Sequence, residues 1–133
     1  MKTDIYNDVL DELIVSRPTH KYKLGDLVEL ESGSIVYITR LTFDCDKKPL
    51  YGFSIKPNIH WIGGRISKAD CGYPEDYIKK LVGHKDAILE FCVDTHYYEC
   101  LLKDVFPLLK GTDYGITAKI DCTEEKLMEL DVN

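Results

Sequence analysis

The sequence has no apolar run that approaches the ~20 residues of a membrane-spanning helix. The first residues lead into an acidic segment and not into the apolar stretch of a secretory signal. The five cysteines are odd in number and scattered, so they do not outline the paired framework of a small secreted protein. We therefore expect free thiols and a cytoplasmic protein that does not contact a membrane.

Motifs of common catalytic and nucleotide-binding sites are also missing. Neither a G-x-G-x-x-G pattern nor a Gly-Lys-Ser/Thr phosphate loop occurs. No cysteine or histidine lies in a recognisable nucleophile motif. The 23 acidic residues are too many to single out one catalytic carboxylate pair. The sequence predicts neither an enzyme nor a bound cofactor.

The best metal-binding pattern is Cys92-x3-His96-x3-Cys100. On one helix the two cysteines would lie ~12 Å apart at about 1.5 Å rise per residue, too far for a single zinc with bonds of about 2.0–2.3 Å. In a hairpin the cysteines could approach each other across strands, but His96 would then lie at the turn. No C-x2-C pair occurs elsewhere, so we expect no metal site.

Charge is unevenly distributed along the chain, whose net charge is −6. Residues 17–82 carry 11 Lys and Arg against 8 acids, whereas residues 83–133 carry 11 acids against 5 Lys. A general nucleic-acid binder needs a basic stripe that releases counterions, and these totals argue against one. The acidic last third could instead meet a basic surface on a partner protein, including a nucleic-acid-binding site, or it could simply keep the chain soluble.

Residues 1–17 are expected to form an N-terminal helix. Thr3 or Asp4 can cap it, and Pro18 disfavours helical geometry at the residue before it. The apolar residues that share one face are Ile5, Val9, Leu10 and Leu13. Such a helix could bind a partner, or it could cover an open sheet edge, which is the interpretation we prefer.

Residues 22–82 hold short strand patterns separated by turns. β-Branched and aromatic residues predict the strands, and glycines mark the turns. The predicted strands are residues 27–30, 35–43 and 50–55. The motif Gly25-Asp26-x-Val28, followed by a turn at Gly33 and two more strands around a polar loop, resembles an SH3-like small β-barrel of the Tudor and KOW type. The resemblance implies a domain that binds peptides, nucleic acid or proteins through aromatic side chains and loops, without catalytic residues.

Residues 56–71 extend beyond a minimal barrel of this kind and hold the only tryptophan. A tryptophan ring with a nearby guanidinium could hold a planar or anionic ligand. The alternative is a β-hairpin whose tryptophan completes the core. Tyrosines from the predicted strands can add rigid contact area to an interface. The candidate ligand- or partner-binding residues are Trp61, Arg65, His60, Tyr37 and Tyr51.

Residues 84–133 are predicted to form a second, acidic unit that is β-rich or α+β and can pack with the barrel as one domain. Residues 72–81 resemble the short helical turn that ends many small barrels, with Tyr77, Ile78 and Leu81 on its apolar face. The boundary is placed at Val82–His84.

Alternation predicts a strand over residues 86–93. Residues 97–102 can return as the second strand of a hairpin, followed by a tight turn at 103–107, although helical spacing over residues 95–106 is the rival prediction. A strand is also expected over 116–120. A final helix should span 124–130, capped by Thr123, with two acids in its first turn.

The resulting interpretation is a mainly β protein with an N-terminal helix, an SH3-like barrel and a second small β-rich unit that ends in a helix. We expect a non-catalytic protein-binding module or inhibitor, similar in type to phage accessory or anti-defence proteins. One alternative is binding of a small anionic, nucleotide-like ligand by Trp61 and Arg65. Another is nucleic-acid binding by the net-positive barrel, through Lys47, Lys48 and Lys56. A homodimer could form if a barrel edge is uncovered.

Overall fold

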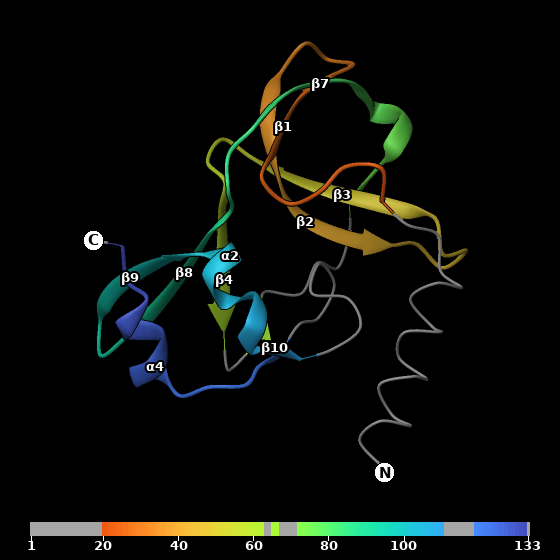
Figure 1. The fold of residues 1–133 in the computed structure, drawn as a ribbon. Helices are drawn as coiled ribbons and strands as arrows, with labels where there is room; N and C mark the ends of the chain where they lie inside the picture. The colour runs from red at the N-terminus through yellow and green to blue at the C-terminus, as the bar shows by residue number, and fades with distance from the viewer. Residues whose placement is uncertain (1–19, 63–64, 67–71, 111–118, 133) are drawn as a thin grey trace.

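The computed structural model describes residues 20–62, 65–66, 72–110 and 119–132. The protein is mainly β, as predicted, with two sheets and short helical segments (Figure 1). The expected N-terminal helix over residues 1–17 lies outside the described residues, as does most of the strand expected over 116–120. No helix in the described ranges is long and apolar enough to cross a membrane.

The first sheet is antiparallel, has the strand order β6-β3-β2-β1-β7 and curls into a half-barrel (Figure 1). Its strands are β1 (Asp26–Leu30), β2 (Ile35–Phe43), β3 (Pro49–Ser54), β6 (Tyr73–Pro74) and β7 (Ile78–His84). The three strands predicted for this part of the chain are confirmed to within a residue or two. The likeness to Tudor and KOW barrels stays a prediction.

The segment after residue 72 differs from the expected helical turn. Only η1 (Glu75–Tyr77) is helical, a 3-10 turn that follows Pro74. Ile78 already begins β7, which pairs with β1 as far as His84. Leu81 was expected on an apolar helical face, but it lies in this strand and is 54% exposed. The pairing of this segment with β1 therefore decides its structure, and the local helical spacing does not.

The second sheet has the order β10-β11-β5-β4-β8-β9. Its strands are β4 (Asn58–Ile62), β5 (Arg65–Ile66), β8 (Ile88–Val93), β9 (His96–Leu101), β10 (Leu109–Lys110) and β11 (Lys119–Ile120). β4 pairs with β8 in parallel, and the other pairs are antiparallel. β4 and β5 precede the boundary expected at Val82–His84, so the two predicted units do not correspond to one sheet each.

The hairpin predicted after residue 86 is confirmed, and the rival helix over residues 95–106 is wrong. Asp94 and Thr95 form the turn with positive φ angles of 49° and 69°, the geometry that lets a two-residue loop match the twist of its strands. The tight turn expected next is instead two helical segments, α2 (Leu102–Val105) and η2 (Phe106–Leu108). The last helix is confirmed as α4 (Glu124–Glu129). The Thr123 hydroxyl accepts a hydrogen bond from the backbone N–H of Lys126 at 3.3 Å.

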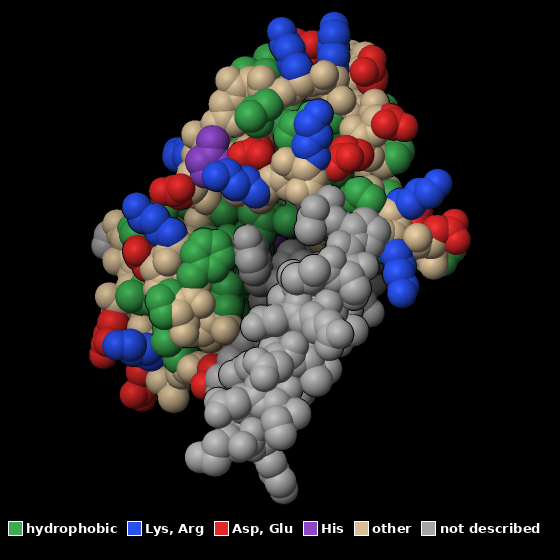
Figure 2. Space-filling model, turned by 45° about the vertical axis from the view of Figure 1, so that its right-hand side comes forward, with side chains coloured by type: hydrophobic (Ala, Val, Ile, Leu, Met, Phe, Trp, Pro, Cys, Tyr) green, Lys and Arg blue, Asp and Glu red, His purple; other side chains and the backbone are tan. Residues whose placement is uncertain are grey.

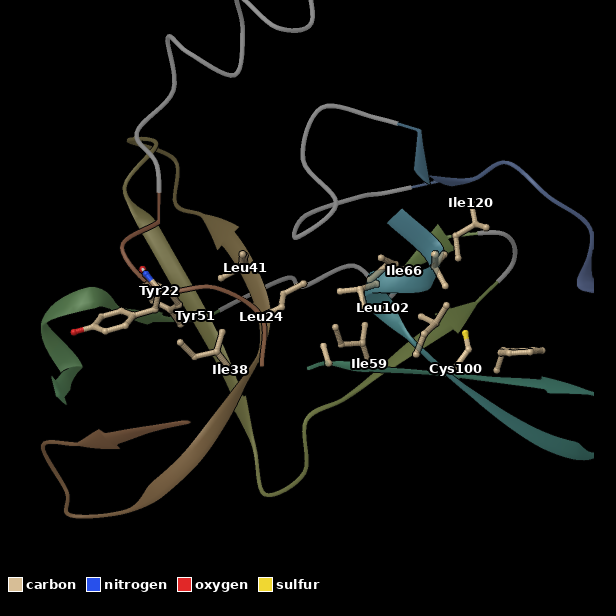
Figure 3. Close-up of a cluster of buried hydrophobic side chains, with 14 of the residues drawn as sticks. Tyr22, Leu24, Ile38, Leu41, Tyr51, Ile59, Ile66, Cys100, Leu102 and Ile120 are labelled. Carbon is tan, nitrogen blue, oxygen red and sulfur yellow. The ribbon is translucent and has the colours of Figure 1, made fainter. Parts of the chain in front are cut away.

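Buried side chains from both sheets form one continuous core. Figure 3 shows Tyr22, Ile38, Leu41 and Tyr51 beside the first sheet and Ile59, Ile66, Cys100, Leu102 and Ile120 beside the second. Leu24 lies between the two groups in this view. Because one cluster of buried side chains spans both sheets, burial couples the two.

The connection between the sheets passes close to Gly25, whose φ is +91°. Its carbonyl oxygen accepts a hydrogen bond from the Lys85 N–H at 2.9 Å. A Cβ at this position would collide with the Lys85 carbonyl oxygen, so only glycine fits. Next to it, the buried Asp26 carboxylate lies 2.7 Å from Nδ1 of His84 at the end of β7.

Candidate functional site

Trp61 is half-buried and belongs mainly to the core of the second sheet. Its ring meets the ring of Phe91 edge to face, with centroids 6.2 Å apart, and Phe91 in turn stacks on Tyr98. The indole Nε1 is buried without a hydrogen-bond partner among the described residues. The core interpretation therefore accounts for most of the Trp61 surface.

His60, also expected at this site, does not form one site with Trp61. His60 precedes Trp61 in β4, so its side chain points to the opposite face of the strand. The His60 side chain is 64% exposed, with Nδ1 3.3 Å from Oε2 of Glu90. Arg65 pairs through its backbone with Ile62, and its side chain lies outside what the structure describes.

Tyr51 is fully buried, so it cannot contact a partner directly, and this part of the expected site is corrected. Its hydroxyl donates to Oε1 of Glu75 at 2.5 Å and accepts from the backbone N–H of Tyr22 at 3.2 Å. Burial, then the hydrogen bond to Glu75, raises the pKa of the Tyr51 phenol well above its usual value. Tyr51 holds η1 against the sheet. Tyr37 is half-buried on β2, opposite Leu27 and Ser54.

A stack of three aromatic rings lies at the β6 edge of the first sheet. Phe53 stacks on Tyr73 with centroids 5.6 Å apart, and Tyr73 stacks on Tyr77 at 4.9 Å with 17° between the ring planes. Tyr73 is 51% exposed, whereas the other two are half-buried against the core. We call these three residues the aromatic ladder. Its two anchored rings hold the exposed one in place.

Two acids lie in η1, between the tyrosines of the ladder in sequence. The Glu75 carboxylate is held by Tyr51 and by the backbone N–H of Lys21, which donates to Oε1 at 3.0 Å. Asp76 is exposed and has no ion pair within the described ranges. One carboxylate thus fixes the turn, and the other is available beside the ladder.

A second polar feature lies between β2 and β3 of the first sheet and β4 of the second. Thr39, Arg40 and Ser54 line a pocket of about 200 Å³ together with Asn58, Ile59 and His60. We call it the Arg40 pocket. Among the predicted ligand-binding residues whose side chains the structure describes, only His60 contributes to it.

These features have little signal in the sequence. Tyr73 and Tyr77 are separated by proline and two acids, a pattern that indicates an exposed turn with aromatic flanks, yet we assigned Tyr77 to a helical face. Nothing in the sequence pairs Arg40 with Gly52, because that contact depends on the register of β2 with β3.

The described residues contain no group of three or more His, Cys, Asp or Glu side chains that could hold a metal ion. In the pattern tested above, Cys92 is exposed whereas Cys100 is fully buried. The four cysteines in the described ranges are free thiols.

No family model matches this chain, and neither a curated protein nor a solved structure matches it.

Proposed function

We propose that the protein is a non-catalytic protein-binding module, and that the aromatic ladder and Asp76 take an extended, positively charged segment of a partner protein. The observation that carries the proposal is the stacked ladder with its half-exposed Tyr73. Rigid tyrosines supply large contact area at low entropic cost, and they are enriched at the centres of interfaces.

The charge of the partner follows from the chemistry of this edge. An aromatic face attracts the ammonium or guanidinium group of lysine or arginine. The exposed carboxylate of Asp76 follows Tyr73 closely in the chain and offers such a group an ion pair. The net charge of −6 favours approach of a basic partner over longer distances.

The edge position supports an extended partner segment. β6 pairs with β3 on one side, and among the described strands none lies on its other side. β6 has only two residues and Pro74 has no N–H, so this edge offers an added segment few backbone groups, and the rings and Asp76 would supply most of the contact. A module that covers a basic surface in this way would act as an inhibitor wherever that surface has another ligand.

The test uses short synthetic peptides of equal length that are rich in lysine and arginine, neutral, or acidic. Binding to the full chain is measured by fluorescence anisotropy. We expect only the basic peptides to bind. Tyr73→Ala should raise their Kd about three- to tenfold, because a cation–π contact contributes ~0.5–1 kcal/mol at an exposed site and more when desolvated.

The matched control is Tyr97→Ala, which removes a tyrosine that is 78% exposed on β9 of the other sheet. Asp76→Asn should weaken the basic peptides, and Asp46→Asn, at an exposed site in the β2–β3 loop, should not. Equal effects of Tyr73→Ala and Tyr97→Ala, or equal binding of acidic peptides, would contradict the proposal.

The two alternative functions stay predictions. Figure 2 shows positive and negative side chains intermixed on the visible face and no continuous basic stripe there, which does not favour a nucleic-acid surface on that face. A homodimer through the β6 edge would compete with the basic peptides, so their Kd should then rise with protein concentration.

A further inference from the structure

The Arg40 pocket begins with a β-bulge. Ile38 pairs with Phe53 and Arg40 pairs with Gly52, which leaves Thr39 without a partner of its own in β3. A bulge of this kind re-aims side chains. The Thr39 hydroxyl lies 3.1 Å from the hydroxyl of Ser54, and both residues line the same pocket as Arg40.

Gly52 makes room for the arginine side chain. A Cβ on Gly52 would come within 2.7 Å of the Arg40 Cβ and 3.0 Å of its Cζ. The stem and guanidinium therefore lie directly over the backbone of β3. Arg40 is half-buried there, and within the described ranges no carboxylate lies within ion-pair distance of it. A partly desolvated cation without a counter-charge attracts an anion more strongly than a fully hydrated one does.

The other side of the pocket comes from β4 of the second sheet, which follows β3 in the chain (Figure 1). Asn58 and His60 are oriented there by Glu90 of β8, whose Oε1 accepts from the Asn58 amide and whose Oε2 lies 3.3 Å from His60 Nδ1. The negative charge of Glu90, which contacts both side chains, would repel an anion. However, it does not line the pocket, and both of its oxygens are already engaged.

We propose that the Arg40 pocket binds the phosphoryl group of a small phosphorylated molecule. The guanidinium offers a planar pair of N–H donors that matches two oxygens of a tetrahedral oxyanion. The hydroxyls of Thr39 and Ser54 and the side chains of Asn58 and His60 supply further polar contacts.

The size of the pocket limits the ligand. Its volume of about 200 Å³ is several times the ~30 Å³ that a water molecule occupies in the liquid. It is smaller than the roughly 300–1,000 Å³ of sites that enclose drug-sized ligands. A phosphoryl group with a small attached group fits, and any larger part of the ligand would lie outside.

This site is separate from the aromatic ladder. Arg40 and Gly52 form a register pair, so their side-chain positions share one face of the sheet. Phe53 follows Gly52 in β3 and points to the other face. Ligand binding in the pocket can therefore be tested without disturbing the residues of the ladder.

The experiment is a titration of the isotope-labelled full chain with sodium phosphate, followed by ¹H–¹⁵N NMR. We expect saturable shifts at residues 39–40, 52–54 and 58–60. Arg40→Gln should raise the Kd about tenfold or more, because a hydrogen bond to a charged group contributes at least that factor. Arg40→Lys keeps the charge but loses the planar pair of N–H donors, so its Kd should lie between that of the natural chain and that of Arg40→Gln.

The matched control for lost charge is Lys48→Gln, at an exposed site at the far end of the β2–β3 hairpin, which should leave the Kd unchanged. Arg40→Lys carries the test if Arg40→Gln does not fold. No shifts at these residues, or the same shifts with sodium acetate, would overturn the proposal, as would an unchanged Kd in Arg40→Lys and Arg40→Gln.

Two further probes identify the source of the phosphoryl group. Methyl phosphate should bind at least as tightly as inorganic phosphate. If methyl phosphate fails to bind, the pocket is a free-phosphate site and the small-molecule proposal is wrong. If a short single-stranded oligonucleotide shifts the signals of the same residues with a lower Kd than methyl phosphate, the ligand is a nucleic-acid backbone. In that case the proposal is again wrong.

Discussion

The two sheets of this protein are assembled in different ways. In the first, β1, β2 and β3 follow one another in sequence and pair as a meander, with β7 returning to β1. In the second, β4 and β5 come from the middle of the chain and β8 and β9 from beyond β7, and the two pairs meet in the parallel contact of β4 with β8. The centre of the first sheet is therefore a local meander, whereas the centre of the second is a long-range parallel pair.

The proposed binding edge and much of the buried core lie in different parts of the molecule. The proposed partner edge lies on the sheet that holds the meander, where two stacked contacts and the Glu75 carboxylate fix the ladder. Much of the shared core comes from the second sheet and the helices beside it in the chain, including Leu89 of β8, Val105 of α2 and Leu127 of α4, all fully buried. We infer that the second sheet stabilises the first, and that neither sheet folds alone because the buried cluster is built from both.

The largest expected effects come from one truncation in each sheet. Ile38→Ala and Leu89→Ala each remove a fully buried side chain, so each should lower the free energy of unfolding by about 2–5 kcal/mol. Urea denaturation is followed by far-UV circular dichroism, which reports both sheets, and by Trp61 fluorescence, which reports the second. If the sheets form one unit, Ile38→Ala shifts the Trp61 transition as much as the circular-dichroism transition.

An unchanged Trp61 transition in Ile38→Ala would mean that the second sheet unfolds independently, and the comparison above would fail. Ile35→Ala is the matched control, because this residue is on the same strand but 55% exposed. Its effect should stay within about 0.5 kcal/mol.

The same contrast explains what the sequence could predict. Strands β1 to β3 follow from alternation and turn residues, because their partners lie next to them in the chain. The parallel pairing of Asn58 with Ile88 leaves no such local signal. At the candidate site, Trp61 was predicted to bind a ligand because it is the only tryptophan, but most of its ring packs against the core. The ladder was missed because its three rings come together only through the pairing of Tyr73 with Tyr51.

A buried thiol tests the second sheet separately. Burial, with smaller effects from Asp104 and Asp131, raises the pKa of Cys100 from 9.0 to about 11. The folded protein thus keeps a proton that the unfolded chain has already released. The stability contributed by the neutral thiol is full below pH 9.0 and is lost as the pH rises towards about 11. The loss should be on the order of 2 kcal/mol.

The measurement is the free energy of unfolding by urea across this pH range, for the natural chain and for Cys100→Ala. The alanine variant should lose less stability with rising pH, whatever its stability at neutral pH. Cys92→Ala removes an exposed thiol from the neighbouring strand and should leave the slope as it is. Identical slopes for all three proteins would show that Cys100 is not desolvated, and the second sheet would then be less tightly packed than the core of the first.

The smallest effect concerns the hydroxyl that joins the core of the first sheet to the proposed partner edge. Tyr51→Phe keeps the ring but removes the hydrogen bonds to Glu75 and to the Tyr22 N–H. The free energy of unfolding should fall by about 1 kcal/mol, as measured by urea denaturation. Tyr37→Phe is the control on β2, because its hydroxyl has no hydrogen-bond partner among the described residues.

The Kd for basic peptides separates two roles of Tyr51. Glu75 keeps its hydrogen bond from Lys21 in the Tyr51→Phe variant, but η1 loses its tie to the buried sheet. If that tie positions Tyr77 and Asp76, the Kd rises together with the loss of stability. A stability loss without any change in Kd would mean that stacking alone fixes the ladder, and the partner edge would then depend on the rings of Phe53 and Tyr77 rather than on the core beneath them.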